Sequence, residues 1–246
     1  MKIIKLDAVN STNEYLKKYI IDNCIKTSHV VYSFNQTKGK GQRGKTWHSD
    51  SGKNLAFSVC FFPKNLKVKN QFSINMLVSL FIINILKSLK IPELKIKWPN
   101  DILSGEKKIC GILNEVKIKG NKIENIIIGF GININQENFE NLPNASSLKL
   151  ISKINYNLDS FVSLIIQSLK KNDYLKFKSE LKIKKISRIY HKKLYGTDAF
   201  INFKNLDDKI FKAKIVSVGE NGIIRIKTCT GKFESYNFQE IQMILN

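Results

Sequence analysis

The architecture is set by the sequence "KKICGILNEVKIKGNKIENIIIGFGININ" (residues 107–135). Two runs rich in Ile and Val lie within it, and runs of this composition are typical of β-strands. "KGNK" (119–122) separates them with the Gly and Asn of a tight turn, so the two runs are predicted to form a β-hairpin. "LKIKWPNDIL" (94–103) and the turn "SGEK" (104–107) come directly before, and they add a further strand to the same unit.

Helical patterns flank these strands. Ser11 and Glu14 match a capping box, which predicts a helix within "NSTNEYLKKYIIDN". Residues 72–89 are mostly apolar but are interrupted by Ser and Asn, so we expect a buried helix there and not a membrane span. Two more helices are expected around residues 158–171 and 173–193. This mixture predicts an α+β fold with a mixed or antiparallel sheet.

The pattern changes beyond Tyr195. Short alternating strands are expected at "AFINF", "IFKAKIVSV", "GIIRIKT" and "KFESYNF", with "NLDD", "GENG" and "TCTG" as the turns between them. Such a run of short strands predicts a small β-barrel. We therefore expect two domains, residues 1–195 and residues 196–246.

Length and composition limit the class of protein. With 246 residues, of which 43% are hydrophobic, the chain can bury a substantial core. The N-terminus becomes polar too early for a signal peptide, and no apolar run reaches 18 residues, so a cytoplasmic protein without membrane association is expected. The four cysteines are far apart and form no C-x-x-C pair, and the three histidines do not cluster with them. A disulfide framework and structural zinc are therefore not expected.

The formal net charge of +21 raises the question of nucleic-acid binding. Only three of the 41 basic residues are Arg, the residue that nucleic-acid readers favour for bidentate contacts. The excess of Lys, Asn and Ile is typical of A/T-rich codons, and residues 196–246 carry a formal charge of only +1. The one dense basic cluster spans residues 170–193. It is expected to be a solvated helix face or, alternatively, a docking surface for an acidic partner.

"GKGQRGKT" (Gly39 to Thr46) fits the phosphate-loop pattern G-x-x-x-x-G-K-[ST]. A true phosphate loop runs from a buried strand straight into a helix. Here "HVVYSFNQ" before the loop reads as a strand, but "WHSDSGKN" after it reads as a loop and "LAFSVCFF" as a second strand. The strand-loop-strand context excludes a phosphate-loop nucleotide triphosphatase, although it does not exclude nucleotide binding.

Four ordered motifs resemble those of the biotin protein ligase family. They are "GKGQRGKTW" (39–47), "KWPND" (97–101), "KICGIL" (108–113) and "GFGIN" (129–133). "STN" and Gln36 also match, so the resemblance covers residues 1 to about 195, and the C-terminal strands resemble the family's barrel as well. The resemblance implies a catalytic domain of the class II aminoacyl-tRNA synthetase-like fold. Because only ten residues precede "STN", it implies the monofunctional form without an N-terminal DNA-binding domain.

The chemistry that the resemblance implies has two steps and uses ATP, biotin and Mg²⁺. The biotin carboxylate first attacks the α-phosphorus of ATP to give biotinyl-5'-AMP, and a lysine amine of a carrier protein then takes the biotinyl group. Two anions must meet in the first step, which requires cations and amides along the line of attack. Lys108 and Arg43 are implied as the catalytic residues, with Lys108 bridging the biotin carboxylate and the α-phosphate.

Two sets of binding residues follow from the resemblance. Biotin is expected to contact Ser11, Thr12, Asn13, Gln36, Gly39, Lys40, Gly41, Gln42, Trp47, Lys108, Gly111 and Leu113. ATP is expected to contact Arg43, Lys45, Trp47, Asn100, Asp101, Lys108 and Asn133. Asp101, with Asn100, is expected to hold Mg²⁺ or to position the phosphates, because hard oxygen ligands suit that ion.

The loop departs from the family pattern at Gln42, where the family has Arg. In the family that Arg helps to retain biotinyl-AMP, and a neutral amide cannot supply a charged fork. Either Arg43 takes over this role or the adenylate is held less tightly. Leakage of free biotinyl-AMP would support the second alternative.

The expected partner is a biotin carboxyl carrier protein of acetyl-CoA carboxylase or a related carboxylase. We expect a monomer or weak homodimer and no specific DNA binding. A lipoate-protein ligase shares the fold and the adenylate chemistry, but its usual R-R-x-S-G-G-G loop is missing from this sequence. A non-catalytic nucleic-acid-binding module is the alternative from a different class.

Overall fold

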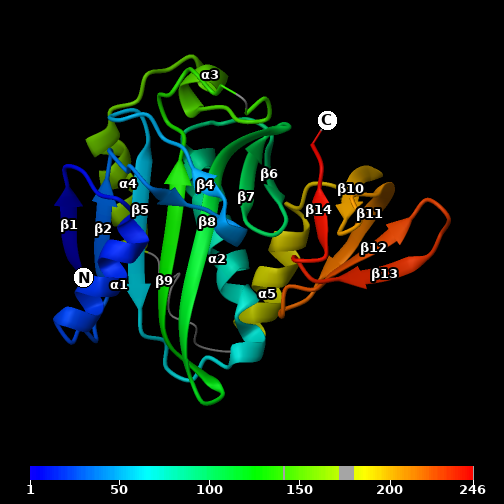
Figure 1. The fold of residues 1–246 in the computed structure, drawn as a ribbon, viewed down its shortest axis with the longest axis horizontal. Helices are drawn as coiled ribbons and strands as arrows, with labels where there is room; N and C mark the ends of the chain where they lie inside the picture. Colours follow the sequence, from blue (N-terminus) through cyan, green and yellow to red (C-terminus); the bar gives the residue numbers. More distant parts are fainter. Residues whose placement is uncertain (141, 172–179, 246) are drawn as a thin grey trace.

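A large mixed β-sheet forms the centre of the molecule (Figure 1). The computed structural model describes residues 1–140, 142–171 and 180–245. The strands of this sheet are β1 (Lys2–Leu6), β2 (His29–Ser33), β5 (Leu55–Phe61), β6 (Leu94–Lys97), β7 (Asp101–Ser104), β8 (Lys107–Lys119) and β9 (Lys122–Ile132). They lie in the order β1-β2-β5-β9-β8-β7-β6, with β1 and β2 parallel and all other neighbours antiparallel. The predicted α+β fold with a mixed sheet is confirmed.

The predicted hairpins form the middle and one edge of this sheet. Strands β8 and β9 pair as far as Lys119 and Lys122 at the "KGNK" turn, and Figure 1 shows them as the two longest strands. Strand β7 pairs with β8 across "SGEK" and with β6 on its other side. Strand β2 pairs with β5 across the Gly-rich segment, so the strand-loop-strand interpretation of that segment is confirmed.

Five α-helices complete the larger unit of the described residues. They are α1 (Thr12–Asp22), α2 (Phe72–Ser88), α3 (Leu148–Ser152), α4 (Leu158–Lys171) and α5 (Glu180–His191). Short 3-10 turns occur at η1 (Gln42–Gly44) and η2 (Val68–Asn70). Helices α1, α2 and α4 confirm the prediction, whereas the short helix α3 was not predicted. The first part of the expected helix over 173–193 lies outside the described residues.

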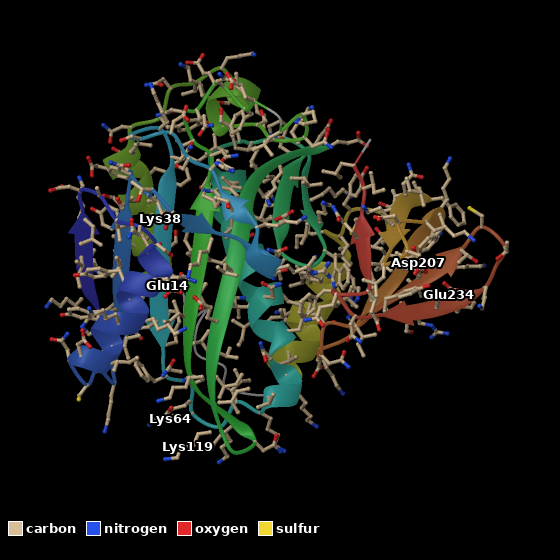
Figure 2. The ribbon with its side chains drawn as sticks, in the orientation of Figure 1. Glu14, Lys38, Lys64, Lys119, Asp207 and Glu234 are labelled. Atoms are coloured by element: carbon tan, nitrogen blue, oxygen red, sulfur yellow. The ribbon has the colours of Figure 1, made fainter. Side chains whose placement is uncertain are left out.

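Half of the predicted capping box is present at α1. Ser11 Oγ accepts a hydrogen bond from the backbone N–H of Glu14 at 3.5 Å. The Glu14 carboxylate, which projects from α1 in Figure 2, instead forms an ion pair with Lys40 at 3.1 Å. Helix α1 is thereby connected to the Gly-rich loop.

Alternating side chains bury both faces of the sheet. In β2, Val30 and Tyr32 join the large core with α2, whereas Val31 packs with Leu16 of α1. Opposite faces are thus covered by different helices, because successive strand residues point to opposite sides. Helix α2, together with η2, is long and apolar enough to cross a membrane, but 78% of its most apolar window is buried inside this fold. It is the core helix that the sequence predicted.

A second, five-stranded antiparallel sheet follows at the right of Figure 1. Its strands are β10 (Ile201–Asn205), β11 (Ile210–Val218), β12 (Ile224–Thr228), β13 (Phe233–Tyr236) and β14 (Ile241–Met243), in the order β13-β12-β11-β10-β14. Figure 2 labels Asp207 in the turn between β10 and β11, and Glu234 on β13. The four predicted strands are present and β14 was not predicted. Among the described residues β13 and β14 form opposite edges, so the strand pairing does not close into a barrel.

Two hydrogen bonds join this sheet to the larger unit. The buried Trp98 donates from Nε1 to the carbonyl oxygen of Gly222 at 3.1 Å. The backbone N–H of Val218 donates to His191 Nε2 at 2.7 Å, and His191 Nδ1 lies 2.8 Å from its own helix carbonyl at Ser187. The apolar cores are continuous across this contact. We propose a domain boundary at residues 195–196, just before the second sheet begins.

Candidate active site

One row of residues crosses the α1 face of the large sheet. The directly paired residues, from β6 to β5, are Lys97, Asp101, Gly111, Gly131 and Ala56. Direct cross-strand partners point to the same face of a sheet. All five line one cavity of about 510 Å³. Strand register therefore brings together residues that come from four separate stretches of sequence.

A β-bulge places Lys108 beside this row. Ile102 pairs with Cys110, and the next residue, Leu103, pairs with Lys108, so two residues on β7 correspond to three on β8. The extra residue of a bulge shifts the alternation of side chains by one. Lys108 consequently shares the face of Gly111, although an odd spacing of three would otherwise direct it to the opposite side. The spacing from Lys108 to Gly111 is the K-x-x-G of the sequence motif.

Lys108 and Asp101 form the central charge pair of the cavity. Lys108 Nζ lies 2.7 Å from Asp101 Oδ1, and it also lies 5.4 Å from the centre of the Trp47 ring. Asp101 Oδ1 is buried and receives no aligned hydrogen bond from the described residues, so this contact is an ion pair only. Lys97 Nζ lies 4.0 Å from the other oxygen, Oδ2.

Trp47 covers the two glycines of the row. Strand β3 (Gly39–Lys40) pairs with β4 (Thr46–Trp47), which brings Trp47 back over the large sheet. A Cβ atom at Gly131 would lie 2.5 Å from the Trp47 ring, and one at Gly111 would lie 2.9 Å from it. Only glycine at these two positions leaves room for the indole in this position.

The Gly-rich loop between β3 and β4 carries the remaining cations. Arg43 has a φ of 58° and Gly44 a φ of 73°, so the turn uses the left-handed region at two consecutive residues. The Arg43 guanidinium lies 5.8 Å from the ring centre of Phe238, which lies in the turn between β13 and β14 of the second sheet. Lys45 lines the cavity, whereas Lys40 is paired with Glu14.

A neutral polar network forms the other end of the cavity. Gln36 Oε1 accepts a hydrogen bond from the backbone N–H of Thr12 at 2.9 Å. Asn13 Nδ2 donates to the carbonyl oxygen of Leu113 at 3.2 Å, and Ser58 Oγ lies 2.6 Å from Asn13 Oδ1. Gly129 is needed here too, because a Cβ atom would collide with the Asn13 amide. The side chains of this network that line the cavity are uncharged, and outside the lining the carboxylate of Glu115 accepts a second hydrogen bond from Asn13 Nδ2 at 2.8 Å.

Two asparagines complete the lining. Asn100 Nδ2 donates to the carbonyl oxygen of Ile112 at 2.8 Å. Asn133 Nδ2 donates to the carbonyl oxygen of Ser146 at 2.9 Å, while its buried Oδ1 has no hydrogen-bond partner among the described residues. The amide of Asn133 is held in position by one end and leaves an acceptor for a ligand at the other.

The structure brings almost the whole predicted set together. The predicted residues that line the cavity are Ser11, Thr12, Asn13, Gln36, Lys40, Gly41, Gln42, Arg43, Lys45, Trp47, Asn100, Asp101, Lys108, Gly111, Leu113 and Asn133. Gly39 lies outside the lining and pairs with Trp47 at the base of the loop.

Sequence reasoning missed several other lining residues. Lys97 could have been found, because it is the residue paired with Asp101 across a short hairpin. Phe238 and the segment 241–245 of the second sheet also line the cavity. They carry no recognisable motif, and their position depends on how the second sheet packs.

The comparison with known protein families agrees with this geometry. The Biotin/lipoate A/B protein ligase family matches residues 6–133, which is more than half of the chain and includes every predicted site residue. The chain belongs to this family.

Individual members of the biotin/lipoate ligase family are similar over part or all of the chain. The bifunctional ligase/repressor BirA of Bacillus spizizenii is 30% identical over 135 residues, which cover 55% of this chain and 41% of BirA. The biotin--[acetyl-CoA-carboxylase] ligase of Mycobacterium tuberculosis is 29% identical over 122 residues, which cover 48% of this chain and 44% of that ligase. This chain therefore spans less than half the length of these two curated relatives.

A solved structure of the family extends the likeness to the whole chain. The biotin protein ligase of Aquifex aeolicus in complex with biotin and ATP superposes with a TM-score of 0.80 at 25% identity. The superposition covers 100% of this chain and 99% of that ligase. Both sheets of this structure thus have counterparts in a biotin protein ligase.

Proposed function

We propose that this protein is an ATP-dependent biotin ligase that attaches biotin to a lysine of a carrier protein through biotinyl-5'-AMP. The observation that carries the proposal is the division of one cavity into two ends. One end presents Lys108, Arg43 and Lys45, and the other presents the neutral network around Asn13 and Gln36. A ligand with a neutral polar head and a carboxylate, next to a polyphosphate, matches this division.

In the first step a carboxylate oxygen of biotin attacks the α-phosphorus of ATP. A new oxygen–phosphorus bond forms, the bond from the α-phosphorus to the bridging oxygen of the β-phosphate breaks, and pyrophosphate leaves with the electron pair. Lys108, at the cationic end of the cavity, reduces the repulsion between carboxylate and α-phosphate because its ammonium group can contact both anions. Arg43 and Lys45 of the loop stabilise the charge that develops on phosphate oxygens.

We assign the binding roles from the family resemblance. Ser11, Thr12, Asn13 and Gln36 hydrogen-bond the ureido ring of biotin, and Gly111 and Leu113 line its pocket. Trp47 covers the ligands and excludes water. Asn100 and Asn133 contact the nucleotide. The loop residues Lys40, Gly41 and Gln42 contact biotin and its carboxylate, whereas Gly39, which lies outside the lining, supports the site by pairing with Trp47.

Magnesium would join the site through Asp101. Within residues 1–140, 142–171 and 180–245, no group of three or more His, Cys, Asp and Glu side chains could form a metal site of protein ligands alone. Asp101 is the one carboxylate in the lining that the structure describes. Mg²⁺ commonly uses one or two carboxylates together with substrate phosphates, so Asp101 fits this mode of binding. When bound, the ion would neutralise phosphate charge.

The second step transfers biotin to a carrier. The lysine amine of a biotin carboxyl carrier protein attacks the carbonyl carbon of the mixed anhydride, an amide bond forms, the amine loses a proton and AMP leaves. A relative named for acetyl-CoA carboxylase supports that carrier as the acceptor. We propose that the reaction takes place in the cytoplasm. The exposed face of α5, with Lys184, Lys185 and Arg188, is suited to an acidic carrier surface. Lys176 and Lys178 of the predicted basic cluster lie outside the described residues.

Gln42 is proposed to weaken retention of the adenylate. It begins η1 and lines the cavity beside Arg43. A Gln42→Arg variant should release less free biotinyl-AMP than the wild type. Equal release from both would assign retention to Arg43.

The experiment that tests the proposed function is biotin-dependent exchange of labelled pyrophosphate into ATP, with lipoate as a parallel substrate. It needs no carrier. Exchange with biotin and not with lipoate is expected, and it should be lost in Lys108→Ala. Lys117→Ala is the matched control, because Lys117 lies on the same strand, far from the cavity, and pairs with Glu124 at 2.9 Å. Exchange with lipoate alone, or no exchange at all, would overturn the proposal.

A further inference from the structure

The second sheet keeps its cations and its carboxylates in different places. Residues 196–246 contain seven Lys and Arg against six Asp and Glu, so the formal charge is only +1. Five of the six carboxylates lie in turns and connecting segments. The sixth, Glu234 on β13, contacts Tyr236 and Lys232. A charge close to zero therefore does not show how the charges are distributed over the surface.

Cations gather on one face of this sheet, the face turned away from the core. Ala213, Ile215 and Ile226 are buried in the core, and successive strand residues point to opposite sides, so the residues between them face solvent. We call this solvent side the outer face. Its members are Lys204, Lys212, Lys214, Arg225, Lys227 and Phe233. Lys204 pairs with Asp208 at 2.5 Å, whereas the other four cations form no ion pair with a described residue.

Two of the unpaired cations lie directly opposite each other. Lys214 on β11 and Lys227 on β12 are cross-strand partners. Like charges in this position destabilise a sheet. No carboxylate of the described residues on β10, β11 or β12 compensates them. A bound anion would remove this repulsion.

The spacing of the four cations suits a chain of phosphates. Lys212 and Lys214 are two residues apart on β11, as Arg225 and Lys227 are on β12, so each pair is separated by about 7 Å along its strand. Successive phosphates of an extended nucleic-acid strand are similarly spaced. The two rows lie side by side, because Lys214 is paired with Lys227.

An aromatic ring lies next to these rows. Phe233 of β13 is 50% exposed, the Arg225 guanidinium lies 4.8 Å from its ring centre, and Lys227 Nζ lies 5.6 Å from it. An exposed aromatic ring beside an arginine is a common platform on which the bases of single-stranded nucleic acids stack. An acidic protein would be matched by the cations alone. The ring therefore favours a nucleic acid.

We infer that the outer face binds single-stranded nucleic acid without reading its sequence. Lys212, Lys214, Arg225 and Lys227 contact phosphates, and Phe233 stacks with a base. None of these five residues lines the cavity of the candidate active site. The inference is therefore independent of the proposed function.

The first test measures binding of a labelled oligothymidylate of about 20 nucleotides by fluorescence anisotropy. Lys214→Ala/Lys227→Ala should raise the Kd at least about tenfold at about 50 mM salt. It should also lower the magnitude of the slope of log K against log salt by about 1.4, because each phosphate contact contributes about 0.7. Lys184→Ala/Lys185→Ala removes the same charge from the exposed face of α5 and should change the Kd less than about twofold. Equal weakening in both double variants would overturn the inference, since net charge alone would then explain binding.

The second test separates stacking from charge. Phe233→Leu keeps an apolar side chain and all the cations but removes the ring. It should weaken binding of the oligothymidylate about fivefold or more. Polyglutamate, which stands for an acidic protein, should bind the wild type more weakly than the oligothymidylate does. Unchanged affinity for the oligothymidylate in Phe233→Leu, or polyglutamate binding of equal strength, would overturn the inference.

The third test locates the site on the wild-type protein. Saturating biotin and ATP should leave the oligothymidylate bound, whereas its displacement would place it in the active-site cavity and overturn the inference. Acetylation with acetic anhydride, read by mass spectrometry, should show about fivefold protection of Lys214 and Lys227 by the oligothymidylate and none of Lys184 and Lys185. Absence of protection at Lys214 and Lys227 would overturn the inference even if the variants failed to fold. Protection without biotin-dependent exchange would refute the proposed function and support the outer face as a nucleic-acid site.

Discussion

The indole ring of Trp47 lies directly on Gly131, so closely that a Cβ atom there would come within 2.5 Å of Trp47 Cε2. Gly131 belongs to the row that crosses the sheet, and Gly111, the central residue of that row, also lacks a side chain where the ring lies. Because the two glycines have no side chains, the sheet is flat at this point. The Trp47 ring packs against it and forms one wall of the cavity. Lys108, 5.4 Å from the same ring, is positioned against that wall.

Replacing Gly131 with Ala should displace Trp47. A methyl group at 2.5 Å must push the ring outward, so the cavity closes less well and water enters. We expect about a tenfold fall in kcat/KM for biotin in the exchange reaction, with a shift of the Trp47 fluorescence. In a Trp47→Ala background the same substitution should have no further effect, because the clash is gone. Independent, additive losses would contradict this coupling.

The ion pair between Asp101 and Lys108 should contribute to stability as well as to activity. Asp101→Asn leaves Lys97 and Lys108 side by side without a counter-charge, so the free energy of unfolding should fall by about 1–3 kcal/mol. Denaturant unfolding measures this loss of free energy. Adding Lys97→Met should restore part of the loss by removing one of the two like charges. A double variant that is less stable than Asp101→Asn would show that Asp101 does not stabilise the fold by balancing the charges of the two lysines.

The neutral end of the cavity should govern affinity for biotin. Asn13→Ala removes the hydrogen bonds to the Leu113 carbonyl and to Glu115 and the contact with Ser58, so the Kd for biotin should rise about tenfold. The KM for ATP should stay within twofold, because the cationic end is untouched. Titration calorimetry with biotin checks the Kd. Asn23→Ala, at the other end of α1 and exposed, is the control and should leave both values unchanged.

The contact of Trp98 with the second sheet should stabilise the whole molecule. Trp98→Phe leaves the carbonyl oxygen of Gly222 without its donor and creates a void, so the free energy of unfolding should fall by about 1–3 kcal/mol. Trp47→Phe should cost clearly less, since the Trp47 ring lies at the half-exposed wall of the cavity. Urea unfolding measures both values. Equal losses of unfolding free energy in the two variants would contradict a stabilising role of this hydrogen bond between the two sheets.

Alkaline pH should weaken the fold near Tyr195. Burial, and then the hydrogen bond that Tyr195 donates to Glu106 at 2.7 Å, raise the pKa of Tyr195 from 10.0 to about 12. The folded state favours the protonated phenol, so its contribution is complete below pH 10 and is lost as the pH rises from 10 towards 12. In Tyr195→Phe the free energy of unfolding should depend less steeply on pH in that range. Identical slopes would contradict the assignment.

Local sequence was sufficient for most of the elements. The strands of residues 94–135 and the helices α2 and α4 follow from apolar runs and from turn residues between them, because these signals act over a few residues. The Gly-rich loop could be separated from a phosphate loop for the same reason: its flanking segments read as strands. Helix α3 and strand β14 escaped detection, since a few residues carry too little pattern to recognise.

By itself, the sequence determined which side chains were candidates for the cavity: a cationic loop, Lys108, Asp101 and a set of asparagines in fixed order along the chain. Only the tertiary structure decided which of them meet. Register across β6, β7 and β8 sets Lys97 beside Asp101, the bulge turns Lys108 onto the same face, and the packing of the second sheet brings Phe238 to the cavity. Pairing between distant segments depends on how whole faces of strands bury one another, and no short stretch of sequence records that outcome.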